Sequence, residues 1–218
     1  MSNTASPHTR KIGTIVLGVI ALWAVVVAGL SAGGVFAALP PQLFAGLVAA
    51  LLLGATSVYV LNPVLRGGVE RFGLRRLSAL HVWRIPAALA FFHYGAQDLL
   101  PPVFVALAGW GDMLAGVMAL GVVLFWPRSR RAYWAFHIVG MADFVLAVGT
   151  GLTLMLLADP RMETITLFPM ALIPLFGVTL SGATHIAAFD MLRRGKGMGE
   201  NAGAHDLLGS DDRHSRKR

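Results

Sequence analysis

The sequence predicts an all-α, polytopic membrane protein: a bundle of six transmembrane helices with both termini in the cytoplasm. Of its 218 residues, 56% are hydrophobic and only 13% are charged, and a soluble domain needs more polar surface than this. Apolar runs of roughly 20 to 27 residues recur along the chain, and at about 1.5 Å per residue each can cross a hydrocarbon core of about 30 Å. Basic residues cluster between alternate runs, which indicates the orientation.

The N-terminal quarter is expected to form a tail and a membrane hairpin. Residues 1–11 are polar and form a cytoplasmic tail, and residues 12–64 contain two spans. The first span runs from Ile12 to about Leu39, which is longer than the apolar core of about 7 to 15 residues in a signal peptide, so we expect it to be retained. Cleavage after Val35-Phe36-Ala37 is the alternative. The second span is Gln42 to Val64.

Residues 65–78 are arginine-rich and too polar to cross a membrane, so we expect an amphipathic segment at the cytoplasmic interface. Residues 79–192 then form a four-helix membrane core that encloses a polar site, with the first two spans packed outside it. Residues 193–218 form a disordered cytoplasmic tail. The four core spans are Ala79–Leu100, Val103–Trp126, Tyr133–Ala158 and Thr166–Leu192.

Charge and cysteine usage exclude several classes of protein. The formal net charge is +7, but the basic residues lie in the loops and the tail, which is typical of membrane orientation. No basic stripe interleaves with aromatic residues, so nucleic acid is not an expected partner. The chain has no cysteine, which excludes disulfides and thiolate metal sites.

Ionisable residues inside the predicted spans mark the candidate site. A charge at the centre of a bilayer costs about 2.5 to 3.5 kcal/mol on insertion scales, so such residues usually pair or serve a function. Asp112 and Asp143 share helix faces with small residues, which points them into helix contacts. Arg84 must find a carboxylate, and we expect Asp143, with Asp112 as the alternative. With His185, these residues form the predicted solute or proton site.

Two further interpretations use His185. It shares an estimated depth with His137 on the preceding span, and two imidazoles on facing helices can ligate haem b, so an oxidoreductase subunit holding haem or quinone is one alternative. The run from Ser181 to His185 resembles the Ser-x-x-x-His element of metal-dependent membrane hydrolases such as alkaline ceramidases. That resemblance implies a lipid hydrolase using both residues. Three histidines with one or two aspartates could also hold a metal ion, but no HxxxH or HExxH spacing supports that site.

The order of features from Arg84 onward resembles a group of uncharacterised small bacterial multi-pass membrane proteins. The resemblance rests on Arg84, the Leu100-Pro101 corner, Gly-Trp-Gly-Asp at 109–112, Asp143 and His185. It implies a location in the bacterial inner membrane and carries no known activity.

The leading functional hypothesis is the binding or passage of a small solute or of protons through the lipid bilayer. Because 218 residues is small for a transporter, a homo-oligomer is expected. A purely architectural role, in which the paired charges hold the helices in register, is the competing interpretation. Whether the protein is an enzyme is left open by these residues.

Overall fold

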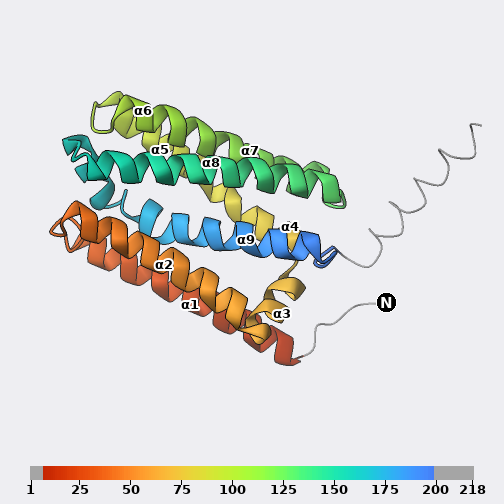
Figure 1. The fold of residues 1–218 in the computed structure, drawn as a ribbon. Helices are drawn as coiled ribbons and strands as arrows, with labels where there is room; N and C mark the ends of the chain where they lie inside the picture. The colour runs from red at the N-terminus through yellow and green to blue at the C-terminus, as the bar shows by residue number, and fades with distance from the viewer. Residues whose placement is uncertain (1–6, 199–218) are drawn as a thin grey trace, which may run out of the picture.

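The computed structural model describes residues 7–198, and the side chains of residues 18–198. Within this part of the chain every regular element is a helix. Figure 1 shows the long helices running side by side, with α9 between the α1–α2 hairpin and the layer that contains α7 and α8. The long helices are α1 (Pro7–Ala32), α2 (Pro41–Leu61), α5 (Arg84–Ala96), α7 (Trp110–Phe125), α8 (Arg130–Leu156) and α9 (Thr179–Arg193).

Short elements complete the helices. They are α3 (Pro63–Phe72), α4 (Leu74–Ala79), α6 (Pro102–Phe104), and the segments η1 (Leu80–Trp83), η2 (Val105–Gly109), η3 (Pro160–Thr166) and η4 (Ile173–Val178). The η1 and η3 segments are 3₁₀ turns, whereas η2 and η4 are π-helical. π-helical turns inside longer helices occur frequently at functional sites.

Among residues 7–198, four helices are long and apolar enough to cross a membrane, and each overlaps one of the predicted spans. They cover Pro41–Leu61, Pro102–Phe125, Arg130–Leu156 and Ile173–Arg193. The other two predicted spans look different. The described apolar stretch of α1 covers only Gly18–Ala32, and the helical run from α4 to α5 is interrupted by η1.

Two predicted boundaries were wrong. The first helix ends at Ala32 rather than near Leu39, where Gly34 adopts a φ of 75° that favours glycine. The last span starts at Ile173 rather than Thr166. Leu167 has extended backbone angles at the end of η3, and Pro169 follows closely, so the helical pattern cannot continue through this stretch.

Local capping chemistry explains where several helices begin. The Asn62 side chain accepts hydrogen bonds from the backbone N–H groups of residues 64 and 65, both at 3.0 Å, and Pro63 follows at the first helical position of α3. Ser129 caps α8 by accepting from the Ala132 N–H at 3.2 Å. Gly73, with a φ of 85°, separates α3 from α4.

The basic clusters gather at one end of the bundle. Figure 1 shows α3, the turn between α7 and α8, and the end of α9 at its right-hand side. These elements carry Arg66, Arg71, Arg128, Arg130, Arg131, Arg193 and Arg194. Arg161 lies on η3, beyond the opposite end of α8.

The outer surface of the bundle is apolar while polar groups lie inside. Large hydrophobic side chains are exposed on α1, α2, α7 and α8, among them Leu22, Leu53, Trp110 and Val145, each more than 60% exposed. Contiguous apolar surface of this kind is unusual for a soluble monomer. The helical fold, its apolar outer faces and its buried polar residues are compatible with a membrane protein.

Candidate functional site

Arg84 lies between two aspartates in the interior of the bundle. Its Nε donates to Asp112 Oδ1 at 2.5 Å, and its Nη2 donates to Asp143 Oδ2. Its Nη1 donates to the Gly140 carbonyl oxygen at 3.3 Å. The arginine side chain is 2% exposed and each aspartate side chain 9%. The sequence offered Asp143 and Asp112 as alternative partners, and the structure pairs Arg84 with both.

Glycines on α7 and α8 allow the helices to approach closely enough for these contacts. A Cβ atom added at Gly111 would overlap the Asp143 carboxylate. A Cβ at Gly116 would lie 2.6 Å from Ile85 Cγ1, next to Arg84 in the chain. A side chain at Gly111 would therefore displace the Asp143 carboxylate, and one at Gly116 would press on the backbone of α5.

The charges of the Arg84, Asp112 and Asp143 side chains do not cancel. One guanidinium facing two ionised carboxylates leaves a formal charge of −1. An uncompensated charge is expensive to bury, and buried groups commonly take up a proton or pair with a cation instead. The cluster of Arg84, Asp112 and Asp143 therefore suits the reversible binding of one proton or one cation.

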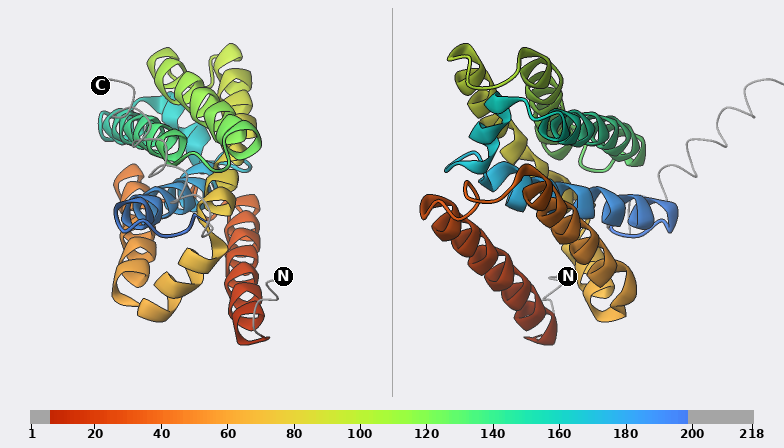
Figure 2. Two further views of the ribbon diagram at one scale, coloured as in Figure 1. Left: turned by 90° about the vertical axis from the view of Figure 1, so that its right-hand side faces the viewer. Right: turned by 60° about the vertical axis from the view of Figure 1, so that its left-hand side comes forward.

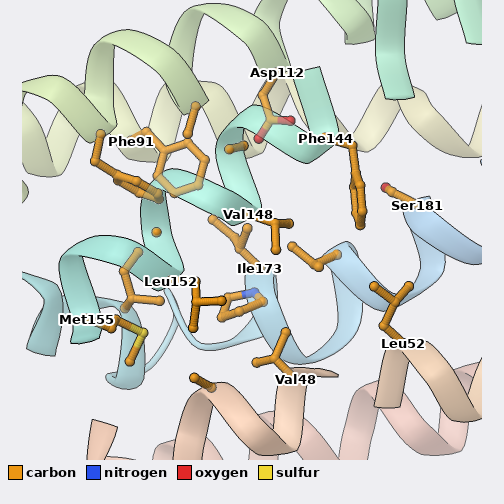
Figure 3. A pocket seen from close by; sticks show the side chains of 18 of the residues that line it. Val48, Leu52, Phe91, Asp112, Phe144, Val148, Leu152, Met155, Ile173 and Ser181 are labelled. Atoms are coloured by element: carbon orange, nitrogen blue, oxygen red, sulfur yellow. The ribbon is translucent and has the colours of Figure 1, made fainter. Parts of the chain in front are cut away.

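A cavity of about 180 Å³ adjoins this cluster. It lies between α2, α5, α8 and the η4–α9 helix, and Figure 3 shows apolar side chains surrounding most of it. Arg84, Asp112 and Ser181 supply its polar groups. Trp83 Nε1 donates a hydrogen bond to Ser181 Oγ at 3.2 Å. The cavity thus has an apolar body and a polar edge.

The cavity is not enclosed by the last four spans alone. We expected the first two spans to pack outside the polar site, but Phe44, Val48 and Leu52 of α2 line the cavity. α2 packs along α9, and this contact carries its side chains to the cavity. Helix α2 is therefore part of the site, unlike α1.

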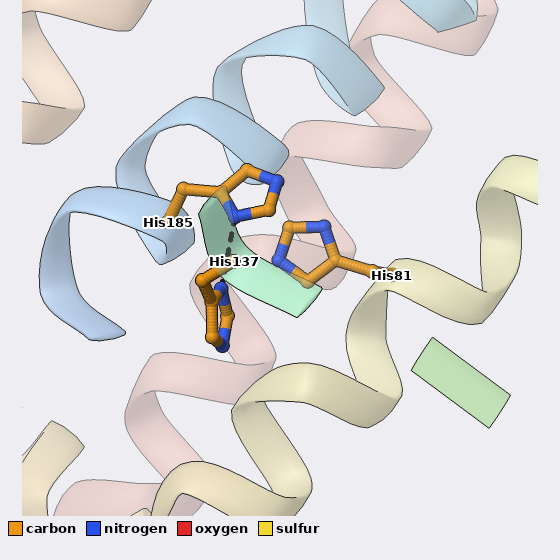
Figure 4. Close-up of side chains that lie close together, drawn as sticks. All are labelled: His81, His137 and His185. Atoms are coloured by element: carbon orange, nitrogen blue, oxygen red, sulfur yellow. Dashed lines mark hydrogen bonds between the residues drawn. The ribbon is translucent and has the colours of Figure 1, made fainter. Parts of the chain in front are cut away.

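Three histidines form a second buried cluster. His81 on η1, His137 on α8 and His185 on α9 are each at most 1% exposed. His137 Nδ1 and His185 Nδ1 share a hydrogen bond of 2.9 Å, and the ring centroids of His81 and His185 are 4.1 Å apart. Figure 4 shows the three rings converging from three helices.

Hydroxyl groups hold the outer edges of this histidine cluster. Ser78 Oγ lies 3.0 Å from His137 Nε2, and Thr184 Oγ1 lies 3.0 Å from His81 Nε2. By contrast, His81 Nδ1 and His185 Nε2 are buried without a hydrogen-bond partner among the described residues. Unpaired buried nitrogens are uncommon in native structures and require an explanation.

Gly140 connects the two clusters. Its carbonyl accepts from Arg84, and a Cβ added to it would lie 2.6 Å from His185 Cε1 and 3.0 Å from His185 Nε2. The histidine ring thus packs directly on the backbone that the arginine contacts. Polar groups consequently follow one another through the bundle from Ser78 to Asp112.

The geometry does not favour the two alternative interpretations of His185. Haem iron between His137 and His185 would require the rings to lie on opposite faces of a porphyrin, yet their Nδ1 atoms are in direct contact at 2.9 Å. Ser181 lies at the cavity and bonds Trp83, and no hydrogen bond joins it to His185 among the described side chains. The hydrolase dyad is therefore not assembled.

Sequence patterns assigned no specific role to His81, Ser78 or Trp83. A signal for His81 was available, because it precedes Arg84 by three residues, and residues three apart lie on one face of a helix. Ser78 and Trp83 carry no comparable signal, since a lone serine or tryptophan near a helix end is common.

Comparisons with known proteins assign the chain to a family but give it no activity. A family model matches residues 38–193, which contain α2 and the two polar clusters but not α1. Neither the search of curated proteins nor that of solved structures gives a match. The match covers most of the chain, so the protein belongs to the family described as Domain of unknown function (DUF8737).

Proposed function

We propose that the protein is a multi-pass membrane protein that binds a small, largely apolar solute and exchanges a proton at the Arg84–Asp112–Asp143 cluster. The observation that carries this proposal is the buried cluster of one cation and two carboxylates at the polar edge of the cavity. The proposal includes six spans, both termini in the cytoplasm, and a homo-oligomer in the bacterial inner membrane.

The distribution of residues supports a membrane location. Polar side chains are inside and large apolar side chains are outside, which is the arrangement that lipid favours. The arginine groups gather at one end of the bundle, and basic residues are enriched on the cytoplasmic side of membrane proteins. That end includes the start of α1 and the end of α9, in agreement with cytoplasmic termini.

The charge of the cluster supports proton exchange. With both aspartates ionised the cluster carries a formal charge of −1, and a proton on Asp112 or Asp143 removes it. Arg84 remains charged under all ordinary conditions. A proton therefore moves the cluster between two charge states without breaking the arginine's contact with the other carboxylate.

The cavity indicates the size and polarity of the solute. Its volume of about 180 Å³ is slightly larger than a cavity of about 150 Å³ that accepts benzene. Both carboxylates already engage Arg84, so an anion would meet like charge at the polar edge. We therefore expect a small neutral or cationic molecule with a mainly apolar body.

Infrared spectroscopy of the purified protein tests the proton step. The carbonyl stretch of a protonated carboxylic acid should appear as the pH falls, shift in D₂O, and change in Asp112→Asn and Asp143→Asn. Asp98→Asn is the matched control, since Asp98 is 85% exposed at its side chain. If the band from a buried carboxylic acid is unaltered in both cluster variants, the proton is not held there.

Proteoliposomes test whether the proton passes across the membrane. A pH-sensitive dye trapped inside reports proton entry driven by a potassium diffusion potential. We expect entry with the unmodified protein and Asp98→Asn, and its loss in Asp143→Asn. Equal proton entry into empty vesicles and into vesicles with each variant would contradict proton passage through the protein. The cluster would then be a proton-binding site only.

A further inference from the structure

We propose that His81, His137 and His185 form a binding site for a divalent transition metal ion, of which Zn²⁺ is the best match. One ligand nitrogen from each ring lies within 4.8 Å of the corresponding atoms of the other two. The rings come from η1, α8 and α9, so the packing of three separate helices brings them together. The geometry of the three rings carries this inference, and the proposed proton site contributes only its charge.

The hydrogen bonds of Thr184 favour one tautomer of His81. The threonine hydroxyl donates its only proton to backbone oxygen, with Leu180 O at 2.7 Å. Its oxygen can then only accept from His81, which places the imidazole proton on Nε2, 3.0 Å away. His81 Nδ1 is consequently left with a free lone pair, buried and without a partner in the described part of the chain.

A histidine that ligates a metal has this arrangement. One ring nitrogen binds the ion through its lone pair, and the other donates its N–H to an oxygen that orients the ring. Thr184 orients His81 in this way, and Ser78 Oγ is positioned to do the same for His137, 3.0 Å from its Nε2. Two of the three rings therefore have an oxygen partner for the nitrogen that faces away from the ion.

The contact between His137 and His185 also points to a missing cation. Two Nδ1 atoms 2.9 Å apart must share one proton, and His185 Nε2 remains without a partner. Ligand nitrogens around tetrahedral zinc are about 3.4 Å apart, given zinc–nitrogen distances of about 2.0 to 2.1 Å. With the shared proton moved to Nε2 of its own ring, small ring rotations would free both Nδ1 lone pairs for a metal ion.

Charge and ligand type indicate which ion fits. Neutral imidazoles bind zinc, copper, nickel and cobalt, whereas magnesium and calcium prefer oxygen ligands. Three neutral ligands do not offset the ion's charge of +2. The neighbouring Arg84–Asp112–Asp143 cluster supplies a formal −1, and Gly140 contacts both Arg84 and His185.

Metal titration of the full chain tests the site. The protein, purified in detergent and stripped with a chelator, is loaded with Zn²⁺, desalted and measured by elemental analysis, and a parallel sample is titrated with Co²⁺ and followed by its visible absorption. We expect about one ion per chain and a tetrahedral cobalt spectrum. His81→Gln, His137→Gln and His185→Gln should each lose both signals.

Two further variants test for metal binding at the surface and for the role of Thr184 in orienting His81. His93→Gln removes an exposed histidine on α5 and should bind the metal normally. Thr184→Val keeps all three ligands but removes the oxygen that orients His81, so its affinity for Zn²⁺ should fall by about 10- to 100-fold. Retained binding in Asp143→Asn together with lost proton exchange would separate this site from the proposed proton site.

If the ligand variants fold poorly, the effect of Zn²⁺ on the melting temperature of the well-folded proteins tests the site instead. Zn²⁺ should raise the melting temperature of the unmodified protein and of His93→Gln, because a ligand that binds only the folded state stabilises it. No stoichiometric metal after loading, or equal metal binding in His81→Gln and the unmodified protein, would overturn the site and identify the cluster as ordinary packing.

Discussion

Two of the clusters in which one arginine contacts two carboxylates lie in very different surroundings. At the basic end, Arg194 donates to Asp190 and Glu70, and the three side chains are between 24% and 36% exposed. In the interior, the side chains of the Arg84 cluster are at most 9% exposed. Water can compensate the charge imbalance in the first cluster, but only a proton or another ion can do so in the second.

This difference indicates which cluster serves a function beyond joining helices. Exposed ion pairs contribute about 0 to 1 kcal/mol and are tolerated almost anywhere. The exposed cluster also includes Tyr59, which donates to Asp190 Oδ2 at 2.7 Å and so links α2 to α9. That is a sufficient structural role. Burying an unbalanced cluster beside a cavity has no comparable structural benefit, because apolar residues would pack the interior as well.

The largest expected effect comes from removing the central arginine of each cluster. Arg84→Met should destabilise the protein by about 3 to 5 kcal/mol, because it leaves two buried carboxylates without a partner. Arg194→Met should cost no more than about 1 kcal/mol, since its partners are partly hydrated. Chemical unfolding in detergent measures both. Equal losses would mean that the two clusters differ less in hydration than their exposures imply.

Gly140→Ala should have an intermediate effect. The added Cβ would lie 2.6 Å from His185 Cε1, and overpacking of this kind costs about 1 to 3 kcal/mol. Gly149→Ala on the same helix is the matched control, because a Cβ there meets no atom within 4 Å. The difference in melting temperature between the two variants measures the effect. Indistinguishable melting would show that the contact between the clusters is loose.

The smallest effect is expected at the end of the bundle away from the basic clusters. A hydrogen bond from Arg161 lowers the pKa of Asp159 below its ordinary value of 3.8. A carboxyl with a depressed pKa in the folded state stabilises the fold above its unfolded pKa, and this stabilisation is lost as the pH falls below 3.8. Asp159→Asn should therefore slightly flatten the acid limb of a plot of melting temperature against pH. An unchanged acid limb would show that the pair has no effect on stability.

Much of the site could be predicted because its strongest signals are local. Arg84, Asp112 and Asp143 are conspicuous in apolar spans, and helical phase alone directs both aspartates toward helix contacts. The pairing of Arg84 with both of them could not be predicted. It depends on how closely α7 approaches α5 and α8, which glycines at positions 111 and 116 allow.

Sequence patterns were enough to predict the helical class, the approximate extents of four apolar helices and the charged residues of the Arg84 cluster. Hydropathy and the 3.6-residue period are properties of short segments, so they can be read without knowing how the helices pack. The meeting of His81 with His137 and His185, and the position of α2 along the cavity, follow instead from how the helices pack together. Convergence of side chains from separate helices depends on helix positions and on the η1 and π-helical segments, and no local pattern contains that information.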